Sequence, residues 1–359
     1  MKTDLKFMAR ALQLAERGRF TTDPNPRVGC VLVKNGRIIG EGFHERAGQA
    51  HAEINALKNS TEDTSGATAY VTLEPCSHHG KTPPCCDALI SAGIKRLIVA
   101  MKDPNPLVSG RGLERCKAAG IEIVCDVLRA DAEKLNRGFI LRMTKNRPFI
   151  RSKIAMSLDG KTALANGESQ WISSPEARAD VHRFRAESSA ILTGIGTVLA
   201  DNPSLNARVD FPIVQPIRVV LDSTLHMPPD SQMSKLDGRT LILTCSTDEQ
   251  KHATLKQAGF ETYVLPESNG RLDLPAVMEF LATQEINNVF VEAGATLNGA
   301  FLEVGLVDEW LIYMASCVLG DKGRGAFALP ELQSMTDKKM LQWRDVRHVG
   351  ADFRLTLSF

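Results

Sequence analysis

The sequence predicts a two-domain α/β protein, and three observations support this fold class. The chain has 359 residues, 43% of them hydrophobic, which is enough for two separate cores. In both halves, short apolar runs of strand length alternate with segments that repeat apolar residues at helical spacing. This order is typical of layered domains with some parallel strand pairing. Residues 145–148 are polar and end in Pro148, which blocks helix continuation, so they predict a domain boundary.

The first half begins with an amphipathic segment in which Phe7, Met8 and Leu12 have helical spacing. Asn35 and Gly36 are typical of a hairpin turn between two strands. By the same criteria we expect helices at residues 7–17, 52–58, 85–92 and 113–119, and strands at residues 28–33, 38–40, 69–73, 97–101 and 121–124.

The second half starts with a strand directly after Pro148 and again alternates. We expect strands at residues 149–155, 190–193, 217–221, 240–244 and 289–291, and helices at residues 176–185, 276–281 and 298–302. The two domains are therefore placed at residues 1–147 and 148–359.

The charge balance disfavours a nucleic-acid partner. The formal net charge is +1, with 43 basic and 42 acidic residues, whereas proteins that bind DNA or long RNA usually carry a basic excess. Charged residues throughout the first twenty positions do not fit a signal peptide, and no segment approaches the ~20 apolar residues of a membrane helix. We expect a cytoplasmic protein with no membrane partner.

Three residues of the first half form a candidate zinc site. His51 opens a predicted helix, Cys76 follows a strand, and Cys85 opens the next helix. One imidazole and two thiolates favour tetrahedral zinc and leave a fourth position for catalysis. Zinc lowers the pKa of a coordinated water toward neutrality. Glu53, two residues beyond His51, could take the proton of that water and pass it to a departing amine.

This pattern fits the His-x-Glu and Pro-Cys-x-x-Cys signature of the nucleobase deaminases, with one departure. Eight residues, 77–84, separate the two cysteines, and they form a polar loop that could meet a substrate phosphate. Two alternatives stay open: the three residues could be ordinary surface and core residues, or the zinc could be structural, with His78 or His79 as a fourth ligand. Of the adjacent Cys85 and Cys86, the register of the signature favours Cys85, whose ionised form the helix dipole would also favour.

Local signals in the second half are weaker. Residues 193–197 (TGIGT) and 291–296 (VEAGAT) each follow a predicted strand, and the second segment precedes a helix. Main-chain amides of the first segment could hold a phosphate, and the helix N-terminus at the second could hold the pyrophosphate of a dinucleotide. A tight turn or a packing requirement for small residues explains them equally well.

The combined motifs resemble the bifunctional deaminase/reductase family of riboflavin biosynthesis, over nearly the whole chain. In the first half they are NPRVG at 25–29, HAE at 51–53, EPCSHHGKTPPC at 74–85 and DPNP at 103–106. In the second half they are SKIAMSLDGK at 152–161, SQWI at 169–172, TGIGT at 193–197, DNPSL at 201–205 and EAG at 292–294. The resemblance implies a cytidine-deaminase-like three-layer domain followed by a dihydrofolate-reductase-like α/β domain. Ala293 departs from the second glycine of many relatives.

The resemblance also implies cofactors and site residues. It implies Zn²⁺ for the deaminase and NADPH for the reductase, acting on a diaminopyrimidinone that carries a ribosylamino 5'-phosphate. Implied substrate contacts in the first domain are Asn25, His44 and Lys81. In the second domain they are Ser169, Arg185, Leu205, Arg208 and Glu292. Implied cofactor contacts are Ala155, Trp171, Thr197, Asp201 and Gly294, and the polar candidates nearest the chemistry are Lys153 and Asp201.

We therefore expect two successive reactions, hydrolytic deamination of the ring and then reduction of the ribosyl group to ribityl. Two other functions stay open: a deaminase of nucleic acid such as tRNA, and a zinc module in which the metal only holds structure. A homo-oligomer is compatible with the sequence, which does not determine it.

Overall fold

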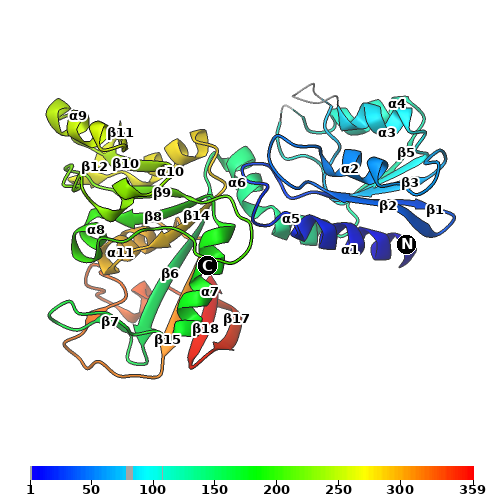
Figure 1. Cartoon of the computed structure of the whole chain (residues 1–359). Helices are drawn as coiled ribbons and strands as arrows, with labels where there is room; N and C mark the ends of the chain where they lie inside the picture. The colour runs from blue at the N-terminus through cyan, green and yellow to red at the C-terminus, as the bar shows by residue number, and fades with distance from the viewer. Residues whose placement is uncertain (1, 78–83, 107) are drawn as a thin grey trace. The chain divides into compact units, whose positions relative to one another are not determined.

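The computed structural model describes residues 2–77, 84–106 and 108–359. The chain divides into two compact units (Figure 1). The first comprises Met1–Asn146 with Pro212–Val214, and the second comprises Arg147–Phe211 with Gln215–Phe359.

The first unit is built on a five-stranded sheet with the order β2-β1-β3-β4-β5. β1 (Gly29–Lys34) and β2 (Arg37–Phe43) form an antiparallel hairpin. Its turn residues Asn35 and Gly36 both have positive φ, which explains the Asn-Gly signal in the sequence. β3 (Thr68–Val71), β4 (Arg96–Val99) and β5 (Glu122–Val124) pair in parallel.

Helices cover both faces of this sheet, which confirms the three-layer architecture. α1 (Lys2–Glu16), α5 (Arg129–Leu135) and α6 (Arg137–Lys145) contribute to the core on one face. α2 (Ala52–Lys58), α3 (Cys85–Ser91) and α4 (Arg111–Ala118) contribute to the core on the other (Figure 1). Cys76 follows β3, His51 directly precedes α2, and Cys85 is the first residue of α3, so these elements carry the candidate zinc ligands.

The second unit contains a nine-stranded sheet with the order β11-β10-β9-β8-β14-β6-β15-β18-β17. The first seven of these strands are parallel, and the last two form an antiparallel hairpin at the sheet edge. In chain order the strands are β6 (Phe149–Ser157), β8 (Ala190–Gly194), β9 (Ile217–Leu221), β10 (Thr240–Thr244), β11 (Glu261–Val264), β14 (Asn288–Glu292), β15 (Glu309–Ala315), β17 (Gln342–Val349) and β18 (Asp352–Ser358).

Alternate residues of these strands face opposite helical layers. Ile191 and Phe290 pack with α7 (Pro175–Glu187), α8 (Ile195–Asp201) and α9 (Glu249–Gln257), while Leu192 and Val291 pack with α10 (Leu274–Thr283) and α11 (Ala295–Glu303). The two-domain α/β prediction is confirmed. The remaining short elements are β7 (Lys161–Ala163), β12 (Glu267–Ser268), β13 (Arg271–Leu272), β16 (Arg324–Gly325) and the 3₁₀ turns η1 (Gln232–Lys235) and η2 (Met335–Asp337).

Candidate active site

Three ligand-type side chains converge in the first unit. One ligand atom from each of His51, Cys76 and Cys85 lies within 4.8 Å of the others. The Nδ1 atom of His51 is 3.2 Å from Sγ of Cys85 and 3.5 Å from Sγ of Cys76. His51 is the N-cap of α2, and Cys85 is the first residue of α3. One nitrogen and two sulfurs at these separations fit the donor set of zinc.

The two sulfurs differ in their electrostatics. The pKa of Cys76 is lowered to about 4, mainly by hydrogen bonding to the Cys85 thiol and also by His51 and the Cys85 N–H, which lies 3.3 Å from Cys76 Sγ. The same pairing, together with burial, raises the pKa of Cys85. Between the two thiols, the local hydrogen bonds therefore favour ionisation of Cys76, and ionisation of Cys85 by the helix dipole stays a prediction. Hydrogen bonding to Cys76 raises the pKa of His51.

Glu53 lies in the first turn of α2 and is 3% exposed. Burial raises the pKa of its carboxyl to about 7, against the opposing effect of His51 and of a hydrogen bond with Cys85. A carboxyl group whose pKa lies near neutral pH can both accept and return a proton under working conditions. The arrangement therefore suits an acid–base group beside the three ligands.

The candidate substrate contacts Asn25 and His44 lie next to this cluster. The His44 ring is 5.3 Å from the His51 ring in an edge-on arrangement. His44 Nδ1 is 3.1 Å from the Ala50 carbonyl, and its Nε2 is 3.0 Å from Nδ2 of Asn25. Because the carbonyl needs a donor and the Asn25 amide nitrogen is one, the ring is neutral with its proton on Nδ1. Burial lowers the pKa of His44, in agreement with that form. Lys81, His78 and His79 lie outside the described residues.

Cys86 has different surroundings. It is fully buried among the apolar side chains of the α2–α3–α4 layer, with Leu89 and Cys116. Burial raises the pKa of its thiol to about 11. Among the described residues, Cys86 is packed in this core and does not belong to the group of ligand atoms formed by His51, Cys76 and Cys85.

Glu74 holds the segment that carries Cys76, and the sequence analysis missed it. Its carboxylate is 3% exposed and accepts four main-chain N–H groups, those of Asp103 (3.2 Å), Gly110 (2.9 Å), Gly112 (3.0 Å) and Leu113 (3.4 Å). The DPNP motif at 103–106 and the start of α4 are thus tied to the end of β3. Glu74 directly precedes Pro75 and Cys76 in the sequence, but the sequence does not identify the main-chain groups that it binds.

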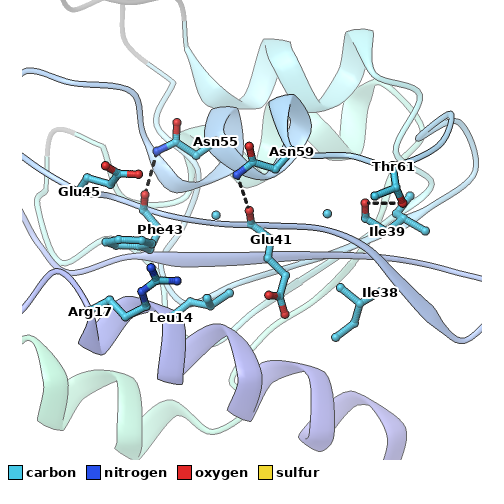
Figure 2. A pocket seen from close by; sticks show the side chains of 12 residues that line it. Leu14, Arg17, Ile38, Ile39, Glu41, Phe43, Glu45, Asn55, Asn59 and Thr61 are labelled. Carbon is cyan, nitrogen blue, oxygen red and sulfur yellow. Dashed lines mark hydrogen bonds between the residues drawn. The ribbon is translucent and has the colours of Figure 1, made fainter.

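A separate cavity of about 450 Å³ lies along the edge strand β2, between α1 and α2 (Figure 2). The polar side chains that line it already cap outward-facing carbonyls of β2. Asn55 donates to Phe43 (2.9 Å), Asn59 to Glu41 (3.0 Å), and Thr61 to Ile39 (3.2 Å) (Figure 2). None of the three zinc-ligand candidates lines this cavity. The capping side chains explain how an exposed sheet edge avoids pairing with another strand.

In the second unit, several predicted residues form one charged cluster. Glu292 at the end of β14 accepts hydrogen bonds from Arg185 of α7 at 2.5 and 2.9 Å, and Nζ of Lys153 on β6 is 3.6 Å away. Burial alone would raise the pKa of Glu292, but Arg185 and Lys153 outweigh it and hold that pKa at about 2. Arg208 joins the cluster through Asn206, to which both arginines donate.

The predicted cofactor contacts are distributed over several segments of the second unit. Ala155 lies on β6, Thr197 and Asp201 lie one helical turn apart on α8, and Gly294 is the N-cap of α11 with open space around it. Trp171 is 70% exposed, and the Arg178 guanidinium lies 4.5 Å from its ring centre. Ser169 and Asp201 make no side-chain hydrogen bond to the charged cluster within the described ranges. Leu205 is buried in the core beside α8.

The three-layer fold and the His-Cys-Cys cluster of the first unit are those of a zinc-dependent deaminase domain, and it is joined to a second α/β domain. The family model for the cytidine and deoxycytidylate deaminase zinc-binding region matches residues 1–101, and the model for the RibD C-terminal domain matches residues 148–355. The chain is 49% identical to the riboflavin biosynthesis protein RibD of Escherichia coli, with 99% of each chain covered, and 46% identical to that of Haemophilus influenzae, with 99% of this chain and 97% of the relative covered.

Solved structures agree with these matches. The Acinetobacter baumannii RibD structure superposes with a TM-score of 0.93 at 41% identity, with 99% of each chain covered. A diaminohydroxyphosphoribosylaminopyrimidine deaminase/5-amino-6-(5-phosphoribosylamino)uracil reductase from Thermotoga maritima gives 0.87 at 35% identity, with the same coverage.

The chain therefore belongs to the RibD family of bifunctional deaminase/reductases of riboflavin biosynthesis. It is an enzyme that combines a deaminase with a reductase, and its cofactors are Zn²⁺ and NADPH. Over the described residues, no helix is long and apolar enough to cross a membrane.

Proposed function

We propose that residues 1–147 deaminate a diaminopyrimidinone carrying a ribosylamino 5'-phosphate, and that residues 148–359 then reduce its ribosyl group to ribityl. The observation that carries this proposal is the convergence of His51, Cys76 and Cys85 beside a buried Glu53 in the first unit. The separate Lys153–Glu292–Arg185 cluster in the second unit supports an independent second step.

In the deamination, His51, Cys76 and Cys85 would hold the zinc, which supplies a Lewis acid that activates water. Glu53 takes a proton from the attacking water and delivers it to the departing amine. Its buried carboxyl suits both transfers because its pKa of about 7 lets either protonation state form near neutral pH. The products are the ring carbonyl and ammonia.

Asn25 and His44 are proposed to orient the pyrimidine ring. The neutral His44 is fixed by Ala50 and Asn25 at hydrogen-bonding distance, 5.3 Å from the His51 ring. A fixed polar pair beside the reactive carbon would hold the bound ring in its reactive orientation. The substrate then loses less orientational freedom on the way to the transition state. Lys81 remains a predicted substrate contact.

In the reduction, Lys153 and Glu292 are proposed to contact the ribosyl group, with Ser169, Arg185, Leu205 and Arg208 as further substrate contacts. NADPH supplies the hydride, and Ala155, Trp171, Thr197, Asp201 and Gly294 are its proposed contacts. Lys153 is the proposed catalytic cation beside the sugar, and Asp201 is the second polar candidate. Three cationic side chains against one carboxylate leave a positive surplus that suits a phosphorylated substrate.

The proposal is tested by measuring ammonia release and NADPH oxidation together on the diaminopyrimidinone ribosyl phosphate. Without NADPH, we expect one ammonia to be released per substrate molecule. When NADPH is added, we also expect one NADPH to be oxidised per substrate molecule. Cytidine and a tRNA substrate serve as controls that should release no ammonia. Ammonia from tRNA but not from the pyrimidine would support the nucleic-acid alternative instead.

We expect a cytoplasmic enzyme that acts on a small-molecule substrate and has neither nucleic-acid nor membrane partners.

A homo-oligomer is also proposed. Its support is the edge strand β17, on which Trp343 is 64% and Val346 is 53% exposed. Light scattering of the wild type and of Trp343→Arg tests this, because a dimer formed through β17 would dissociate in the variant.

A further inference from the structure

Residues 206–208 lie outside any strand or helix, and side chains from elsewhere in the second unit form hydrogen bonds with their backbone groups. The Gln215 side-chain amide accepts the Ala207 N–H (3.1 Å) and donates to the Ala207 carbonyl (2.8 Å). Arg185 donates to the Asn206 carbonyl (3.1 Å), and the Arg208 N–H donates to Nδ1 of His182 (3.1 Å). The segment is therefore fixed by three side-chain clamps.

The preceding residue, Leu205, has an unusual backbone conformation. Leu205 has a φ of 44°, in the left-handed region that a branched apolar residue rarely adopts. Its side chain is 3% exposed and belongs to the core that includes Val198 and Met233. Such a conformation persists only where packing and hydrogen bonds determine it, and it is often found at ligand sites.

One helix face provides two of the clamps. His182 and Arg185 are three residues apart on α7 and therefore lie on the same face. Arg185 reaches both Glu292 and the Asn206 carbonyl. Because the Arg208 N–H is a donor, Nδ1 of His182 must accept and the ring proton must lie on Nε2. Burial, followed by the charges of Arg185 and Arg208, lowers the pKa of His182 to about 4 against the opposing effect of Glu292, so the ring is neutral at pH 7.

We propose that His182 is a positioning residue of the reductase site, which holds the Arg208 main chain so that the Arg208 guanidinium meets the anionic end of the substrate. This inference rests on the reduction proposed above. Asn206 provides the second restraint, since its side-chain oxygen accepts from Nη1 of Arg208 at 3.0 Å. Without His182, the main-chain N–H of Arg208 loses its hydrogen bond, and the Arg208 guanidinium is held less firmly in position.

The test compares His182→Ala, His182→Asn and the control Arg183→Ala, a neighbouring exposed residue on α7. The Asn side-chain oxygen can replace Nδ1 as the acceptor, whereas Ala cannot. We measure KM and kcat for NADPH-dependent reduction of the deaminated substrate, and the Kd of NADPH. His182→Ala should raise KM about tenfold with kcat nearly unchanged, because it weakens ground-state and transition-state binding alike. His182→Asn should recover most of that loss, and Arg183→Ala should behave as wild type.

An unchanged KM in His182→Ala would overturn the inference. So would a parallel loss of kcat and NADPH affinity that Asn fails to restore, because it would indicate a general structural role. A wild-type chain that does not reduce this substrate would refute the proposed function instead. In that event, titration of the three variants with inorganic phosphate still tests His182, and equal affinities for phosphate would contradict its role.

Discussion

Glu53 illustrates how burial can prepare a single residue for chemistry. Its carboxyl is 3% exposed, and desolvation raises its pKa to about 7 even though His51 opposes the shift. An exposed glutamate would stay ionised at neutral pH and would return a proton poorly.

We predict that Glu53→Gln keeps zinc but lowers the rate of ammonia release by several orders of magnitude, because an amide cannot transfer the proton in either direction. Reduction of the deaminated substrate should be nearly unchanged, which controls for folding. Metal analysis and the two rate assays on the purified variant provide the check. Ammonia release at the wild-type rate would remove Glu53 from its proposed role.

The adjacent cysteines provide a second residue-scale test. Cys85 lies within the three-residue cluster, whereas Cys86 is packed in the apolar core. We predict that Cys85→Ser loses zinc and deamination and that Cys86→Ser keeps most of both. Atomic absorption on the two variants measures this directly, and zinc retained in Cys85→Ser but lost in Cys86→Ser would identify the other sulfur as the ligand.

Residue types with a specific chemistry could be recognised from sequence, but residues that act on the backbone could not. His51, Glu53, Cys76 and Cys85 stand in a spacing that few other functions require. Glu74 and His182 accept main-chain N–H groups from residues 26 to 39 positions away, and the identity of those partners has no sequence signature. Their roles become visible only when the tertiary structure is known.

At the scale of elements, Glu74 joins the end of β3 to the start of α4. All four of its contacts are N–H donors. Gly112 is also required here, because a Cβ at that position would lie 2.1 Å from the Pro75 carbonyl. The position of Cys76 therefore depends on an interaction between two elements that are distant in sequence.

We predict that Glu74→Gln lowers the free energy of unfolding by about 1–3 kcal/mol, because the new NH₂ group opposes main-chain donors that stay buried. It should also weaken zinc binding, since Cys76 lies two residues away. Thermal unfolding and zinc titration measure both effects, with the exposed Glu114→Gln on α4 as the matched control. Equal stability of the two variants would refute the anchoring role.

Several elements with a clear apolar pattern were predicted well, although the apolar strands β15 and β18 were missed. The strands β9 and β10 have the predicted bounds, and α2 matches its prediction as well. α5 and α6 were missed because Asn136 separates two short, strongly charged helices. β17 was missed because its side chains are exposed on both faces, so that no alternation of polar and apolar residues appears.

At the scale of the whole molecule, each unit has its own sheet and its own core. The second unit begins at Arg147, whose guanidinium pairs with Asp308 at 2.7 Å. Arg147, which lies in the predicted domain boundary at residues 145–148, is therefore also part of the fold of the second unit.

We predict that a chain starting at Arg147 folds alone and binds NADPH, because the core of the second unit is contained within it. A chain starting at Phe149 should be less stable, since Asp308 loses its partner. NADPH titration and thermal unfolding of both fragments test this. A folded fragment from Arg147 without affinity for NADPH would contradict the assignment of the reductase to residues 148–359.

The central claim is that one chain carries two chemically independent sites, of which only the first needs zinc. The most direct measurement is the rate of both reactions after zinc has been removed with a chelator and then restored. We expect ammonia release to disappear without zinc and to return with it, while NADPH-dependent reduction of the deaminated substrate continues throughout. Loss of the reduction together with the deamination, recovered only when zinc returns, would contradict the claim that the two sites are independent.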